Sequence, residues 1–429
     1  MSKFRDFLTI LVIVFMTGVN VSPNAPRSLD SLDMASGNIT TQIVKSLIYL
    51  IAFSLLILKW KDAVRLSGKN IFIWIALFWV LASAIWSTEP SITLRRSVGL
   101  LGTTVIALYF ATRYDFKRFA MMASWSFLMI NILSLLVIAF FPAQGISSYP
   151  YGWQGVYFTK NGLGVNALFG IILFAAMLGN RKTAALGIMG MVLSLILLIG
   201  SRSVTSLIVS VFVLSVWGVL HPFFNRNRPV FIASLFCLLI FLLFGVWLYL
   251  TDNIEIVFRM LGKDPTLTGR VPIWEIVLLY IRQSPWLGYG YGAVWLGKDY
   301  GIGSSISSSI NYYVVNAHNG YLDLILEIGV IGVVLVLMVI VAVLAKLIAD
   351  IRHSTRVSSY ELWPIVVVIA LVVYNSTEAM LLVQNSIAWI LIAYLGFGIP
   401  GNGDSQPAAH HRREKLTRAP IPAERLSPA

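Results

Sequence analysis

Long apolar runs constrain this chain more than any other feature of its sequence. A membrane-spanning helix needs about 20 mostly apolar residues, and the 429-residue chain contains a succession of runs close to that length. Hydrophobic residues make up 58% of the chain and charged residues 12%, whereas soluble domains have roughly 45–50% and 25%. These values exclude a cytosolic enzyme, a disordered protein and a nucleic-acid binder of ordinary composition. They predict an all-α integral membrane protein.

Hydropathy predicts about 12 transmembrane helices. Their predicted ranges are Phe7–Val21, Ile39–Leu58, Ile71–Trp86, Ser97–Thr112, Ala120–Phe141, Gly162–Leu178, Thr183–Gly200, Val204–Leu220, Val230–Leu250, Tyr321–Ala345, Leu362–Leu382 and Gln384–Ile399. The first run follows Lys3 and Arg5 as in a signal peptide, but no small-residue cleavage pattern follows it. We therefore expect it to remain as the first span.

The distribution of Lys and Arg gives the orientation. Cytoplasmic loops of membrane proteins carry an excess of these residues, and most of the 32 in this chain fall on one side when the N-terminus is placed inside. Both termini are then cytoplasmic, and the net charge of +13 needs no nucleic-acid partner. The expected divisions are a membrane domain of helices 1–9 (1–250), a large extracytoplasmic loop between helices 9 and 10 (251–320), helices 10–12 (321–399) and a disordered cytoplasmic tail (400–429).

A minority of the cations oppose this rule because they lie on the outer side or at the outer ends of spans. They are Arg27, Lys45, Arg95, Arg96, Lys160, Arg202, Arg259, Lys263, Arg270, Arg282 and Lys298. Positive charge outside calls for another reason, and the pattern indicates an anionic ligand at the outer leaflet. Arginine suits a diphosphate because its planar guanidinium donates two parallel hydrogen bonds to phosphate oxygens.

The outer loop is the only connection large enough to build a reaction site. An amphipathic helix is expected to start near Pro272, which suits a first helical turn. The aromatic and glycine-rich run Ser284–Trp295 follows, and then Gly301–Ser309, whose glycines and serines predict a mobile lid. The loop closes with Asn316–Gly320, directly before the tenth span.

His318 is the only one of the five histidines that this topology places outside. An outer-face reaction that needs an imidazole base therefore has one candidate. The alternative is a capping or interfacial histidine at a helix start. Arg270 in the same loop and Arg202 at the outer end of the seventh span favour a functional role.

Three carboxylates lie within predicted spans, where ionisable groups are costly and are functional candidates. Asp323 and Glu327 are four residues apart on one helical face, and Glu378 falls in the outer half of the eleventh span. Pairing with the outer arginines to hold the fold is an equally good interpretation. For Arg95 and Arg96, an ion pair and a phosphate contact are both open, and a snorkelling role is open for Lys160.

No cysteine or histidine spacing indicates a metal site, and Cys237 stands alone in an apolar run. Asp30 and Asp33 could hold a divalent ion on a lipid diphosphate, although a solvated loop accounts for them better. We expect neither a metal site nor a cofactor.

Three motifs resemble the superfamily of O-antigen ligases and Wzy-type polymerases, and most closely its exopolysaccharide production branch of the ExoQ type. They are LGKDPTLTGRVPIW (261–274), SPWLGYGYGAVW (284–295) and AHNGYLDLILEIGVIG (317–332), with weaker support from YFTKNGLG (157–164) and GSRSVTS (200–206). The combination of an upstream TGR…W with the histidine motif is fairly specific, and the resemblance covers most of the chain outside its termini.

The resemblance implies a metal-independent glycosyltransferase at the outer face of the bacterial inner membrane. It would transfer glycan from undecaprenyl diphosphate to an acceptor sugar hydroxyl, with inversion at the anomeric carbon. The family's loop histidine falls on His318 and its loop arginine on Arg270, while Arg202 matches a basic position at the end of the seventh span. Supporting roles are implied for Lys160, Asn161, Asn319, Asp323, Glu327 and Glu378, and Arg95 and Arg96 are further candidates for substrate binding.

Three functions remain to be separated. A polymerase of lipid-linked repeat units is preferred, with an O-antigen ligase acting on lipid A core as its alternative. A flippase or transporter of lipid-linked oligosaccharide is the rival from another class, but such proteins often show a repeat between halves, and none is visible here. A chain-length regulator and a flippase are the expected protein partners.

Overall fold

The computed structural model describes residues 2–19, 39–147, 151–235, 238–239, 270–297, 300–352 and 357–398. Its regular structure is helical apart from one pair of short strands, in which β1 (Ile146–Ser147) pairs antiparallel with β2 (Gly152–Trp153). The helices are α1 (Ser2–Met16), α2 (Ile39–Ile57), α3 (Trp60–Ser67), α4 (Ile71–Ala82), α5 (Pro90–Arg113), α6 (Phe116–Phe140), α7 (Pro142–Gly145), α8 (Lys160–Leu178), α9 (Ala184–Ser201), α10 (Val204–Phe224), α13 (Arg270–Gln283), α14 (Gly301–Ser309), α15 (Gly320–Arg352), α16 (Ser359–Tyr374) and α17 (Ile387–Phe397). Most of the predicted ninth span, the loop before Arg270, the acids Asp30 and Asp33 and the tail lie outside these residues.

The described helices are those of a multi-pass membrane protein. Five are long and apolar enough to cross a membrane, or six if the bent pair α2 and α3 counts as one span. Three shorter apolar helices accompany them, at Ile71–Ile85, Ser359–Tyr374 and Ile387–Phe397. The predicted class is therefore confirmed, whereas the number of twelve spans stays a prediction.

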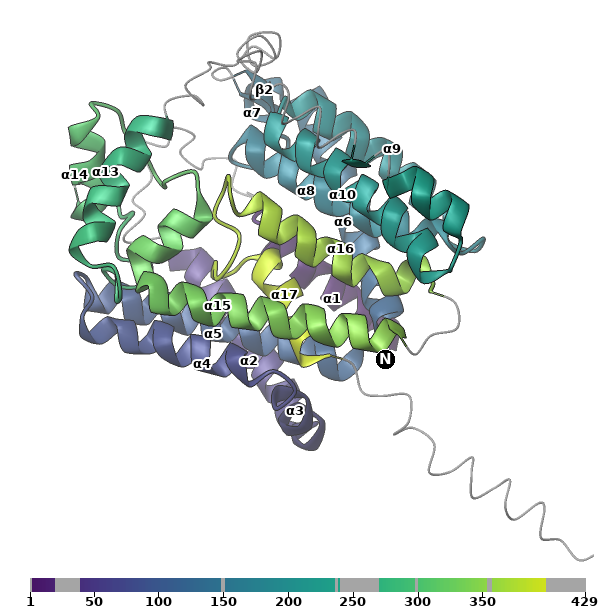
Figure 1. Cartoon of the computed structure of the whole chain (residues 1–429), viewed down its shortest axis with the longest axis horizontal. Coiled ribbons are helices and arrows are strands. Elements are labelled where there is room, and N and C mark those ends of the chain that lie inside the picture. The colour runs from purple at the N-terminus through teal and green to yellow at the C-terminus, as the bar shows by residue number, and fades with distance from the viewer. Residues whose placement is uncertain are drawn as a thin grey trace, which may run out of the picture.

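Small residues let the helices pack closely, as in other membrane bundles. At the contact between α8 and α9, a Cβ on Gly190 would lie 2.2 Å from the ring of Phe174. Figure 1 shows α8, α9 and α10 side by side in teal, with α15 and α16 in green alongside α17 in yellow. Aromatic rings fill the centre, where Phe119 stacks on Tyr394 at 4.2 Å between ring centroids.

Helix α15 is broken at Gly329, and the aromatic and glycine-rich segment 284–292 fills the break. Gly329 has φ +67°, and a Cβ there would lie 2.0 Å from the carbonyl oxygen of Trp286. The freed helix carbonyls of Leu326 and Glu327 accept hydrogen bonds from the backbone N–H groups of Tyr289 (2.9 Å) and Gly290 (2.8 Å). The segment thus satisfies polar groups that lipid could not, which explains its place directly against α15.

Two of the predicted boundaries that differ from the structure affect candidate site residues. Helix α16 ends at Tyr374, so Glu378 lies in the connection between α16 and α17 and not within a span. The side chain of Asn375 ends the helix, because its Oδ1 accepts the N–H groups of Met380 (2.9 Å) and Leu381 (3.1 Å) and folds the chain back.

Helix α5 begins at Pro90, seven residues before the predicted start, because Pro suits the first turn and the helix extends beyond its apolar part. Arg95 and Arg96 are therefore helical residues and do not precede the helix.

Gly301–Ser309 also forms a helix, α14, which packs with α13 in a small apolar core.

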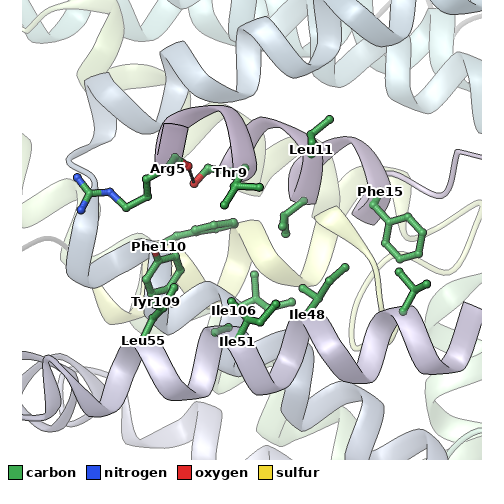
Figure 2. A pocket seen from close by; sticks show the side chains of 14 residues that line it. Arg5, Thr9, Leu11, Phe15, Ile48, Ile51, Leu55, Ile106, Tyr109 and Phe110 are labelled. Atoms are coloured by element: carbon green, nitrogen blue, oxygen red, sulfur yellow. Dashed lines mark hydrogen bonds between the residues drawn. The ribbon is translucent and has the colours of Figure 1, made fainter. Parts of the chain in front are cut away.

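An apolar groove of about 350 Å³ runs between α1 and α2, with α5 as its floor. Figure 2 shows Leu11 and Phe15 on one wall, Ile48 and Ile51 on the other, and Arg5 at one end. Nearly all of its lining is aliphatic or aromatic, which suits a surface that faces lipid chains.

Candidate active site

Three predicted residues meet at one carboxylate oxygen of a fourth, Oε1 of Glu378. The imidazole Nδ1 of His318 lies 3.1 Å from it, and the side-chain amide of Asn161 donates to it at 3.0 Å. A guanidinium nitrogen of Arg270 lies 3.7 Å from the same oxygen. We call these four residues the His318 cluster. They come from the starts of α8 and α13, the segment before α15 and the connection after α16, so the fold brings together positions more than 200 residues apart.

The backbone around His318 is held firmly. His318 has a left-handed φ of 48°, which is uncommon for a residue with a side chain. Its N–H donates to the side chain of Asn316 at 2.9 Å, and its carbonyl accepts from Arg270 at 3.5 Å. The preceding residue, Ala317, donates its N–H to Asp323 (3.0 Å) and accepts from the indole of Trp274 (2.8 Å). Unusual backbone conformations of this kind are often kept at functional sites.

The arrangement of the cluster suits a general base, His318, whose ring is oriented by the carboxylate of Glu378. The side chain of Glu378 is 14% exposed, that of Arg270 18% and that of His318 32%, so the imidazole is the part that a substrate could reach. When Nδ1–H donates to Glu378, Nε2 is left as the proton acceptor, as in other base–carboxylate pairs. Arg270 balances the carboxylate charge and places a cation beside the imidazole.

A second basic group lies around Tyr151, next to the hairpin. The guanidinium of Arg202 lies over the Tyr151 ring at 4.7 Å from its centroid, and Nζ of Lys160 donates to the Tyr151 carbonyl at 3.4 Å. Arg202 is exposed, whereas Lys160 is buried. Since Lys160 precedes Asn161 in the first turn of α8, this group is linked to the His318 cluster through one helix terminus.

A third set of predicted residues, Arg96, Asp323 and Glu327, lies around the segment 291–295. Arg96 donates to the carbonyl of Gly292 at 2.6 Å, and it lines a polar pocket together with Asp323 and Glu327. Asp323 accepts from the indole of Trp295 at 2.8 Å and is not paired with an arginine in the described contacts.

Two further predicted residues are Asn319 and Arg95. Asn319 caps α15, because its Oδ1 accepts from the N–H groups of Tyr321 (3.1 Å) and Leu322 (3.3 Å). Arg95 is exposed on α5.

Trp274 and Tyr291 lie in the sequence motifs and Asn316 lies in the segment that closes the outer loop, but the sequence assigns none of them the contacts that the structure shows. Gln384 is in none of the motifs. Asn316 and Trp274 fix the His318 backbone, and Tyr291 lines the polar pocket, where burial raises the pKa of its phenol and keeps it neutral. Gln384 lines the same pocket from the connection before α17. The only available signal for Gln384 was a polar residue between two apolar runs.

Comparison with known proteins confirms the resemblance. Residues 189–337 match the family described as "O-Antigen ligase", and this range contains Arg202, Arg270 and His318. The Exopolysaccharide production protein ExoQ of Rhizobium meliloti (strain 1021) is 27% identical over 288 residues, which are 61% of this chain and 61% of that protein. The alignment thus spans about three-fifths of the relative.

Proposed function

We propose that this chain is a polymerase of lipid-linked exopolysaccharide repeat units in the bacterial inner membrane. It takes glycan from undecaprenyl diphosphate at the outer face and transfers it to a sugar hydroxyl of an acceptor that is also lipid-linked. The observation that carries the proposal is the convergence of His318, Arg270 and Asn161 on Glu378.

The reaction follows from the polarity of the cluster. His318 Nε2 takes the proton of the acceptor hydroxyl while its oxygen attacks the anomeric carbon, and Glu378 stabilises the imidazolium that forms. The bond between the anomeric carbon and the diphosphate oxygen breaks, and its electron pair leaves with undecaprenyl diphosphate. Attack from the face opposite the leaving group inverts the anomeric centre.

Cations supply the stabilisation of the leaving group. Arg270 lies beside the base, and Arg202 and Lys160 lie near the next helix terminus. Fixed guanidinium groups aimed at developing phosphate charge act as preorganised electrostatic catalysts. The predicted orientation, with both termini in the cytoplasm, puts these groups on the side to which lipid-linked repeat units are delivered.

The test compares the lipid-linked glycans of cells that carry wild-type protein or His318→Ala at equal protein levels. A polymerase variant accumulates single repeat units on the outer leaflet. Long polymer that stays on its lipid would indicate the ligase, which the family description "O-Antigen ligase" keeps as the second candidate. Repeat units trapped on the cytoplasmic leaflet would indicate a flippase and contradict the proposal.

A further inference from the structure

A polar pocket of about 180 Å³ lies beside the His318 cluster and has no role in the transfer step described above. Five parts of the chain form it: α5 at Arg96, the segment 291–295, Asn316 before α15, the first turns of α15 and the connection 379–384. Its polar lining comes from Arg96, Asn316, Asp323, Glu327 and Gln384. Such a polar set inside an apolar protein needs a partner, because burying unpaired polar groups is costly.

One oxygen in this pocket lacks that partner. Asp323 is 5% exposed, and its Oδ1 already accepts from the Trp295 indole and the Ala317 N–H. Its Oδ2 is buried and has no hydrogen-bond partner among the described residues. A carboxylate oxygen accepts and does not donate, so the missing group is a hydrogen-bond donor such as a hydroxyl.

The lining also includes apolar side chains, Leu324, Leu381 and Val383. A pocket that combines polar and apolar side chains matches a sugar ring, which carries hydroxyls at its rim and C–H groups on its faces. The two carboxylates outnumber the single guanidinium of Arg96, so the charge disfavours an acidic sugar. The fitting ligand is a neutral, hydroxyl-bearing ring.

The pocket and the His318 cluster share two chain segments. Asn316 lines the pocket and accepts the N–H of His318, and Ala379, the neighbour of Glu378, lines it as well. The His318 side chain is not part of the lining. A ring in the pocket therefore lies beside the reacting sugar and is not itself the reacting group.

We propose that this pocket is a glycan subsite that binds a neutral sugar residue next to the reacting one, with Asp323 Oδ2 accepting a ring hydroxyl. The inference rests on the proposed function, because it assigns part of the same glycan substrate. Arg96 on α5 and Glu327 on α15 flank the ring, and the apolar lining residues contact its C–H groups.

Two variants test the subsite, with binding as the readout. The probe is the neutral oligosaccharide obtained by partial acid hydrolysis of the host's own exopolysaccharide, titrated calorimetrically into the full-length protein in detergent. In Asp323→Asn, the amide oxygen keeps the two existing N–H partners, so the NH₂ group replaces Oδ2 and donates where an acceptor is needed. In Val383→Trp, the larger indole occupies the space that Val383 lines. Val341→Trp, on the exposed face of α15, is the matched control.

Loss of a hydrogen bond to a charged group predicts a drop in affinity of roughly tenfold to a hundredfold for Asp323→Asn. Val383→Trp is expected to abolish binding, while Val341→Trp keeps wild-type affinity. Wild-type affinity in both Asp323→Asn and Val383→Trp would overturn the subsite because the sugar then binds outside the pocket, and no binding by the wild-type protein would overturn it as well. Failure of the proposed function gives a different result, namely polymer of normal length from His318→Ala cells.

Discussion

The most informative perturbation is at Glu378, where replacement by Ala and by Gln separates its charge from its hydrogen bonding. Glu378→Ala removes the acceptor of two close hydrogen bonds, to His318 at 3.1 Å and Asn161 at 3.0 Å, and the counter-charge of Arg270. Breaking a buried pair by removing one member costs about 3–5 kcal/mol. The side chain is 14% exposed, so we expect a loss of unfolding free energy near the lower value, about 3 kcal/mol.

Glu378→Gln keeps an oxygen that accepts at the same place and is expected to lose only about 1 kcal/mol. Its activity should still fall by roughly 10²–10⁴-fold, because a neutral amide does not stabilise the imidazolium. Denaturant unfolding in detergent measures the stability, and polymer formation from lipid-linked repeat units measures the rate. Glu275→Gln, on the exposed face of α13, is the control. Wild-type rates for Glu378→Gln would contradict the role of the carboxylate charge in catalysis. Equal destabilisation by Ala and Gln would contradict the role of the accepting oxygen in stability.

Three further perturbations address other parts of the structure. Gly329→Ala should destabilise the protein by more than about 3 kcal/mol, through strain at positive φ and a contact 2.0 Å from a carbonyl oxygen; Gly218→Ala, whose Cβ meets nothing within 4 Å, should stabilise α10 by roughly 0.5–1 kcal/mol in the same thermal unfolding experiment. Arg202→Gln should lower kcat and kcat/KM together for the lipid-linked donor, as expected for a cation that stabilises the diphosphate charge developing in the transition state, and wild-type kinetics would remove it from the donor site. A double-mutant cycle of Asn161→Ala with Glu378→Ala should give a coupling energy of about 1 kcal/mol or more, and strict additivity would mean that the 3.0 Å hydrogen bond contributes nothing.

The sequence predicted the helical class and much of the site, because both depend on local patterns. Apolar runs located α2, α4 and α8 within a few residues, and the TGR and histidine motifs identified Arg270 and His318. Hydropathy locates membrane spans from the local sequence, without information about the helices that pack beside them. Ionisable residues are rare within membrane spans, so they also point to chemistry without any three-dimensional contact.

The parts that escaped prediction depend on contacts distant in sequence. The role of Glu378 as the common acceptor became visible only when α8, α13 and the segment before α15 met, because no spacing relates Asn161 to Arg270. The early end of α16 follows from the side chain of Asn375. Hydropathy does not indicate this end, because Asn375 lies inside the predicted 21-residue span Leu362–Leu382. The break in α15 follows from the neighbouring segment 284–292, which supplies the missing hydrogen bonds.

The central claim, that the His318 cluster performs glycan transfer, is tested most directly with purified protein in liposomes. The substrate is a single lipid-linked repeat unit, added to wild type, His318→Ala and the exposed control Glu275→Gln, and the products are separated by size. The account predicts a ladder of lipid-linked polymers and released undecaprenyl diphosphate from wild type and control, and only the starting unit from His318→Ala. A ladder from His318→Ala at the wild-type rate would contradict it.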